Sequence, residues 1–525
     1  MHCKPAAAGR RPRTCQTARR SLELAIMDRS RTPDPRARRP ERRPHGRAAA
    51  LVAAAAIAAS IGGGASSALG APPPGAHPAA APAAPTGPAD AGDPAIASGL
   101  KALHRGEYGR ALDDFRRAAA ADPGAPGPLF YPVFARWWQG LFAEGPAAAP
   151  DNAFDDAYAA AVNVSEARLD ATPRDVDALA TLGGSAILRA HVEALRGNYW
   201  RSGQQARRGK KALEQALAID PAREQALFGM GALNYYADRV PLIVKGMRLL
   251  FFMPGGDAPL GLTQIRKVAS GRGPLRTDGR LLLGMVCADR YQQAYDDALA
   301  HLDVALDETG GSSLIRAAIG DQQVRLARYG AAAATLESAL ADAGGAGVEA
   351  SRQRRWLGFG LAEALAGDWR LDEAETALAR AAGEQAPASE GLQRVTRRLA
   401  AEIAARRGAL TMPASGPAGA PEAPEGDGMA AAGRLLAGRR LIDAGRAAEA
   451  APILETAADL LPRESPPWLA GSVHLYLGLA LKGSGDAAAA IGHFDKAIAT
   501  RRFRAADRAR FELGKKGENA ALCAP

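Results

Sequence analysis

A recurring pattern of small, large apolar and proline residues constrains the fold of this chain more than any other feature of its sequence. One copy is at Gly99, Gly106, Tyr108, Ala111, Phe115, Ala118 and Pro123. Further copies in matching register are at Gly438, Gly445, Ala450, Leu454, Ala457 and Pro462, at Gly478, Gly485, Ala490, Phe494 and Ala497, and more weakly at Gly320, Tyr329, Ala332, Leu336 and Ala339. Because generic amphipathic helices do not keep such intervals, the pattern predicts repeated helical hairpins.

The spacing resembles the helix-turn-helix unit of about 34 residues found in tetratricopeptide repeats. In such a unit, a small residue on the first helix lets the second helix come close, and an aromatic residue or leucine fills the gap between neighbours. The resemblance implies an all-α fold, an α-solenoid of tetratricopeptide-like helix-turn-helix repeats, in which each unit is stable through its neighbours. A chain of 525 residues is also longer than one compact core usually accommodates.

The positive charge of the chain is concentrated at its N-terminus. The formal net charge is +10, and residues 1–47 hold fourteen Lys and Arg against four acidic residues, which is also +10. The remainder therefore has 66 − 14 = 52 basic and 56 − 4 = 52 acidic residues, and its net charge is zero. Since a neutral body has no net field to attract phosphate, we expect no nucleic-acid partner.

The basic block is followed by an apolar segment, residues 48–61, and then by small residues up to position 70. This order is typical of a secretory signal, with cleavage expected before Ala71 and with Met27 as the better start, because a leader from Met1 would have a very long basic region. We therefore expect export to the periplasm or cell envelope. The alternative is a basic tail on a cytosolic protein.

Two segments rich in proline and alanine interrupt the repeats and predict the domain boundaries. The expected parts are a basic leader with signal peptide (1–70), a linker (71–94), the main α-solenoid (95–408), a second linker (409–428), a C-terminal repeat pair (429–514) and a tail (515–525). The C-terminal pair is either a mobile module beyond the second linker or part of one continuous array with a long surface loop.

Residues 240–253 are apolar around almost the full circumference of the predicted helix, including Leu249, Leu250, Phe251 and Phe252. Such a helix is either buried on several sides or lies at a lipid boundary. We favour burial, because solenoid helices already contact two neighbours. Pro254, Gly255, Gly256 and Asp257 then predict a helix stop, a tight turn and the N-cap of the next helix.

This region, with its order Tyr-Tyr-Ala-Asp-x-x-Pro, apolar helix and Pro-Gly-Gly-Asp, resembles a group of exported bacterial tetratricopeptide proteins of unknown function. The resemblance implies a shared structural element rather than a reaction. Chaperone-docking members of the wider superfamily bind a C-terminal carboxylate with Lys and Asn on first helices. The corresponding positions here hold Leu435, Arg439, Leu475 and Leu479, so that activity is not expected.

An aromatic cluster in the sequence LFYPVFARWWQGLF is the candidate partner-binding surface, because Trp and Tyr contribute much of the energy of protein interfaces. Its members are Phe130, Tyr131, Phe134, Trp137, Trp138 and Phe142. The alternative is that these side chains pack over the first repeats.

The sequence predicts no catalytic residue, no metal site and no cofactor. No two-histidine zinc motif, nucleophile elbow or phosphate loop is present. Cys287 and Cys523, which follow the leader, are too few for a disulfide framework, and we expect Cys287 to fill a small slot in the core. The acids near Asp155 lack the later ligands of a calcium loop.

The sequence therefore predicts an exported, non-enzymatic scaffold for a protein or peptide partner. One alternative is a peripheral envelope protein that places helix 240–253 on lipid. A more remote alternative is an enzyme with an unrecognised site.

Overall fold

The computed structural model describes residues 93–141, 152–239, 255–289, 291–344, 347–385, 390–411, 431–461, 465–500 and 503–525. They belong to one compact unit, Gly46–Pro525. The regular structure of the described residues is helical throughout, without strands, which confirms the predicted all-α class. No helix in these ranges combines the length and apolarity needed to cross a membrane. The leader, most of both predicted linkers and helix 240–253 lie outside the described residues.

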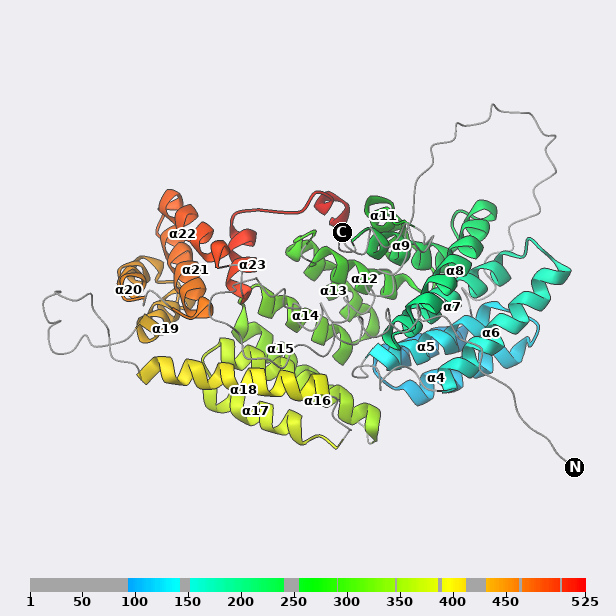
Figure 1. Cartoon of the computed structure of the whole chain (residues 1–525), viewed down its shortest axis with the longest axis horizontal. Helices are drawn as coiled ribbons and strands as arrows, with labels where there is room; N and C mark the ends of the chain where they lie inside the picture. The colour runs from blue at the N-terminus through cyan, green and yellow to red at the C-terminus, as the bar shows by residue number, and fades with distance from the viewer. Residues whose placement is uncertain are drawn as a thin grey trace, which may run out of the picture. The chain divides into compact units, whose positions relative to one another are not determined.

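Helices that are adjacent in the sequence pack against each other as successive pairs (Figure 1). The first are α3 (Pro94–His104), α4 (Tyr108–Ala121), η1 (Gly127–Leu129), α5 (Phe130–Leu141), α6 (Asn152–Ala171), α7 (Val176–Leu195), α8 (Tyr199–Ile219) and α9 (Glu224–Asp238). The middle ones are α11 (Ala258–Ala269), α12 (Arg276–Cys287), α13 (Tyr295–Thr309), α14 (Ser313–Arg325), α15 (Tyr329–Asp342), α16 (Val348–Gly367), α17 (Leu371–Gly383) and α18 (Glu390–Thr411). The last are α19 (Ala431–Asp443), α20 (Ala447–Asp459), α21 (Pro467–Gly483), α22 (Ala487–Ala499), α23 (Phe503–Glu512) and η3 (Ala520–Cys523).

Glycines on the first helix of a pair receive the large side chain of the second helix. A Cβ added to Gly99 would lie 2.4 Å from the Phe115 ring, and one added to Gly478 would lie 2.6 Å from the Phe494 ring. Leu454 covers Gly438 in the same way, and Leu336 covers Gly320. The large side chain is sixteen positions further on in every case (115 − 99, 494 − 478, 454 − 438, 336 − 320). These contacts are the physical basis of the repeated sequence spacing.

The turns inside the pairs also repeat. The amide of Glu107 donates to the Ala102 carbonyl at 2.9 Å, and the amide of Asp486 donates to the Leu481 carbonyl at 2.9 Å. This hydrogen bond spans a residue in the left-handed region, which is Gly106 (φ 78°) in the first turn and Gly485 (φ 97°) in the second. In the weaker copy of the repeat the equivalent residue is Ala327 (φ 53°).

Ala327→Gly should raise the free energy of unfolding by about 0.5–1 kcal/mol, because a left-handed backbone strains an L-residue but not glycine. The matched reverse change, Gly485→Ala, should lower it by about 1 kcal/mol, since an added Cβ meets nothing within 4 Å and only the backbone is strained. Urea unfolding midpoints compare both variants with the parent protein. A loss of stability in Ala327→Gly would mean that the contact of its methyl group outweighs the backbone strain.

The C-terminal helices contact the main array through arginines. Arg504 pairs with Glu363 of α16 at 2.8 Å, and Arg508 donates to the Leu326 carbonyl at 3.0 Å. Arg439 of α19 donates to the Gly367 carbonyl at 2.9 Å and pairs with Asp368. The division into a main array and a C-terminal repeat pair stays a prediction. Helix α18 also extends to Thr411, so the first residues of the predicted linker 409–428 are helical.

Candidate functional site

The N-terminal helix pair packs against helices from the middle of the array. At the end of α3, Nε2 of buried His104 lies 3.1 Å from Oδ1 of buried Asp278 on α12. The hydroxyl of Ser312, which caps the N-terminus of α14, donates to the His104 carbonyl. These contacts bring the turn between α3 and α4 beside the turn between α13 and α14, two turns that are distant in the sequence.

A groove of about 860 Å³ lies along this junction. One side is formed by the α3–α4 turn, the first half of α4 and the polar face of α5, and the other side by the α13–α14 turn, the end of α15 and α16. Its lining is mostly polar, with Gln139, Ser313 and Gln353 among its uncharged side chains. A groove of this size accommodates a short stretch of polypeptide.

Four arginines and three acidic side chains line the groove, namely Arg105, Arg110, Arg116, Arg136, Glu107, Asp113 and Asp342. The acids are already paired: Arg110 lies 3.1 Å from Glu107, Arg116 lies 2.8 Å from Asp113, and Asp342 pairs with Arg316.

For Arg105 and Arg136, no carboxylate of the described residues lies within ion-pair distance. Arg136 donates to the Gln139 amide oxygen at 2.9 Å. The groove therefore offers two guanidinium groups suited to an acidic ligand.

The predicted aromatic cluster lies mainly inside the protein. Phe130, Tyr131, Phe134 and Trp138 are between 0% and 7% exposed, in contact with Phe115 and Phe228. Half-buried Trp137 donates from its indole nitrogen to Nδ1 of His191 at 2.7 Å, and Phe142 lies outside the described residues. This burial agrees with the packing alternative, and the partner-binding role of the cluster stays a prediction.

Arg136 belongs to the same helix, α5, as the aromatic cluster. Its neighbours in the sequence fill the core, whereas its own side chain lines the groove. The sequence did not single out Arg136 or Arg105, because the other side of the groove, from Gly310 to Gln353, comes from positions about two hundred residues away.

The Tyr-Tyr-Ala-Asp and Pro-Gly-Gly-Asp elements meet where α9 packs against α11. A Cβ on Gly256 would lie 2.3 Å from the Asn234 carbonyl oxygen, and one on Gly261 would lie 2.6 Å from the Tyr235 amide nitrogen. The Asp257 side chain accepts from the Leu260 amide at 2.9 Å, as expected of an N-cap. In the described residues of these two elements, the backbones of α9 and of the segment that leads into α11 are thus in close contact. Leu249, Leu250, Phe251, Phe252 and Pro254 lie outside the described residues, so a core or lipid role for that helix stays a prediction.

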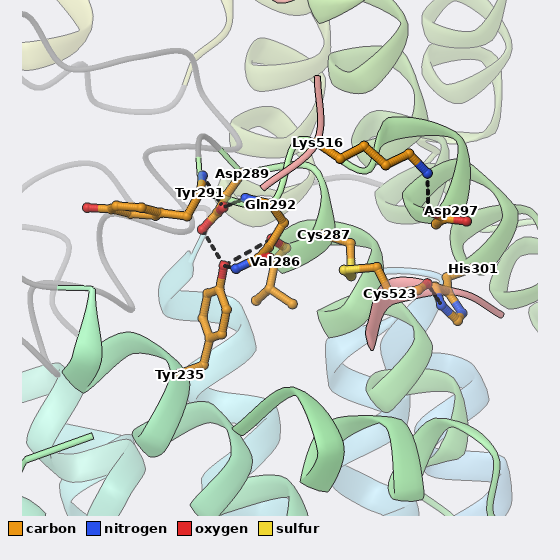
Figure 2. Close-up of a disulfide and its surroundings, with 10 residues drawn as sticks. All are labelled: Tyr235, Val286, Cys287, Asp289, Tyr291, Gln292, Asp297, His301, Lys516 and Cys523. Carbon is orange, nitrogen blue, oxygen red and sulfur yellow. Dashed lines mark hydrogen bonds and ion pairs between the residues drawn. A yellow bond between two sulfur atoms is a disulfide. The ribbon is translucent and has the colours of Figure 1, made fainter. Parts of the chain in front are cut away.

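Tyr235 anchors a buried polar cluster next to this contact (Figure 2). Its hydroxyl donates to Oδ2 of Asp289 at 2.7 Å, and the Tyr291 amide donates to Oδ1 of Asp289 at 2.7 Å. Burial raises the pKa of the Asp289 carboxyl and raises the pKa of Tyr235 well above its usual value. The donors around Asp289 satisfy its oxygens, which is typical of a structural polar cluster.

Cys287 and Cys523 form a disulfide with a Cα–Cα distance of 5.7 Å, which corrects the expectation that Cys287 merely fills a core slot. Cys287 is fully buried, but it holds the C-terminal segment on α12 and α11 (Figure 2). His301 Nε2 lies 3.0 Å from the Cys523 carbonyl, and Lys516 pairs with Asp297 at 3.0 Å. The sequence feature that could have predicted this disulfide is that Cys287 and Cys523 are the two cysteines that follow the leader.

Within the described ranges, no group of three or more potential ligands is placed to hold a metal ion. Asp155 pairs with Arg189 and with Arg196 instead. Arg439, at one of the clamp positions of chaperone-docking repeats, is buried between the rings of Tyr329 and Tyr476, 5.7 Å from each centroid. Its guanidinium stabilises the junction between repeats.

The described residues form a tetratricopeptide-like array of helix pairs with a polar groove. No protein-family profile matches its sequence, and no curated protein matches it. Similar solved structures include the crystal structure of yeast Tom70, at 14% identity and a TM-score of 0.29, in an alignment over 82% of this chain and 88% of that chain. The APC/C hetero-tetramer Cut9-Hcn1 matches at 14% identity and a TM-score of 0.16 (79% and 83% covered), and Naa15/Naa10 bound to HypK-THB at 15% and 0.17 (82% and 67% covered). At these values the assignment of the fold rests on the helix pairs themselves.

Proposed function

We propose that this protein is an exported, non-enzymatic scaffold that binds a protein or peptide partner in the bacterial cell envelope. The observation that carries the proposal is the groove between α4 and α16, with Arg105 and Arg136 available to a ligand. Helical repeat arrays bind partners on such extended surfaces. The signal-like leader supports export, and so does the Cys287–Cys523 pair, because disulfides persist in oxidising compartments.

The preferred ligand is an acidic peptide segment or the terminal carboxylate of a polypeptide. Each guanidinium can bind a carboxylate with two parallel hydrogen bonds, which gives both energy and orientation. Partners with basic segments are disfavoured, because they would place like charges beside Arg105 and Arg136.

A photocrosslinking amino acid at Gly109 tests the groove in living cells. Gly109 lines the groove, and a side chain there would meet no atom within 4 Å, so the probe should leave the fold intact. We expect adducts of discrete mass with one or a few proteins. Arg105→Glu with Arg136→Glu should reduce their yield at least tenfold without moving the thermal melt by more than about 2 °C, because Arg105 is exposed and half-buried Arg136 loses only its hydrogen bond to Gln139.

The control places the same probe at Arg398, an exposed position of α18 away from the groove lining. It should give none of these adducts. Equal adducts from both positions, or adducts that persist in the double arginine variant, would contradict binding in the groove.

A further inference from the structure

Helix α8 begins with two exposed aromatic side chains at the end of a hairpin. Tyr199 is 49% exposed and Trp200 is 56% exposed, directly after the turn at Gly197 (φ 76°). Contiguous exposed apolar surface of this kind marks an interaction site. A ring with a polar group at its edge is the kind of side chain that prefers a boundary between water and an apolar phase.

The same helix is strongly basic. It carries five basic residues, Arg201, Arg207, Arg208, Lys210 and Lys211, and one acidic residue, Glu214. Arg208 lies 2.5 Å from Glu166, and Lys210 lies 2.9 Å from Glu214.

Arg201, Arg207 and Lys211 are exposed, and among the described residues no carboxylate lies within ion-pair distance of Arg201 or Lys211. Trp200, Arg207 and Lys211 are spaced by seven and four residues, which places them on one face of the helix.

This distribution of charge is unfavourable for the free helix. The N-terminus of an α-helix carries partial positive charge, yet the first turn of α8 has no acidic residue and contains Arg201. Arg207 and Lys211 are also like charges one turn apart. A bound anionic surface would remove both costs, so the charge pattern points to a negatively charged partner.

We propose that the aromatic–basic face of α8, formed by Trp200, Arg207 and Lys211 with Tyr199 and Arg201 on either side of Trp200, docks on an anionic lipid surface. Basic side chains there would meet lipid phosphates, while the two rings would enter the headgroup layer. None of these residues lines the groove. Because they lie on the outside of a helix and not in a groove, they suit contact with a broad lipid surface better than with a peptide. Residues 48–525, with α8 included, have no net charge, so the attraction would be local to α8.

Vesicle co-sedimentation tests the proposal with protein produced from Ala71, which removes the basic leader and keeps every described helix. Vesicles contain phosphatidylcholine alone or with 30% phosphatidylglycerol. We expect binding to the anionic vesicles, weakened by salt. Arg201→Gln, Arg207→Gln and Lys211→Gln together should reduce the partition coefficient about 100-fold, at about fivefold for each basic residue near an anionic surface.

A matched triple variant removes the same charge elsewhere: Arg380→Gln, Arg397→Gln and Arg398→Gln, all exposed on α17 and α18. It should bind as the parent does. Brominated lipid should quench the tryptophan emission of the parent more than that of Trp200→Phe, which places the ring in the bilayer. A variant with Phe251→Ser and Phe252→Ser should still bind, which separates α8 from the apolar segment 240–253.

Three results would overturn the assignment: no binding to anionic vesicles at low salt, equal losses in the two triple variants, or unaltered quenching in Trp200→Phe. Binding of soluble poly-glutamate through the same residues without binding of vesicles would instead make the partner an acidic protein. The groove proposal is tested separately by the crosslinks at Gly109, so either can fail alone.

Discussion

Cys523→Ser should lower the free energy of unfolding by about 3–5 kcal/mol, the largest loss we expect from a change outside the core helices. The disulfide links positions 236 residues apart, and a cross-link over so long a loop strongly restricts the unfolded polypeptide. The folded state would lose an anchor as well, since the Cys523 carbonyl contacts His301 and η3 packs on α11. Urea unfolding of protein produced from Ala71 measures the change.

A reducing agent provides the control for this prediction. It should destabilise the parent protein by nearly the same amount and leave Cys523→Ser unchanged, because the variant has no cross-link to lose. Thiol titration of the folded parent should detect no free cysteine before reduction. Two free thiols under oxidising conditions, or a parent that does not respond to reductant, would contradict both the cross-link and its support for export.

Gly256→Ala should destabilise the protein by about 3 kcal/mol. Its Cβ would lie 2.3 Å from the Asn234 carbonyl oxygen and 2.4 Å from the Asp238 amide nitrogen. Both are backbone atoms of α9 and its end, so no side-chain rotation relieves the overlap, and α9 and α11 would have to separate.

Gly255→Ala is the matched control one residue earlier. A Cβ there meets nothing within 4 Å, and we expect a change within about 0.5 kcal/mol. Calorimetric melts of the two variants should therefore differ by several degrees. Equal melting temperatures would mean that the Pro-Gly-Gly-Asp turn does not need the close approach of α9 and α11 that we assign to its second glycine.

Much of the fold could be predicted from the sequence, because the contacts within each repeat join residues that lie close together in the sequence. Gly99 and Phe115, or Gly478 and Phe494, are near enough in the sequence for one hairpin to bring them together, so their spacing carries the contact. The turn residues Gly106 and Gly485 are likewise fixed by local backbone geometry. The turn at Ala327 could not be predicted in this way, because alanine stands there at the position that glycine occupies in the other turns.

Much less of the candidate site could be predicted from the sequence. The aromatic side chains of α5 are hydrophobic enough for either an interface or a core, and only the packing of α4, α6 and α7 around them places most of them inside. The pairing of Cys287 with Cys523 depends on the C-terminal segment lying on α12, which no local pattern encodes.

The all-α fold class, the pairing of helices within each repeat and the charge of each segment could be predicted from the sequence, because these depend on residues within one or two helices of each other. Which charges of the described residues lack a partner depends on the tertiary structure. Arg105 becomes available to a ligand because the α3–α4 turn lies beside the turn that precedes α14, whereas Arg439 is engaged by Asp368 and two tyrosine rings. The physical reason is that ion pairing depends on distances of a few ångströms between segments whose separation in the sequence sets no limit on their approach.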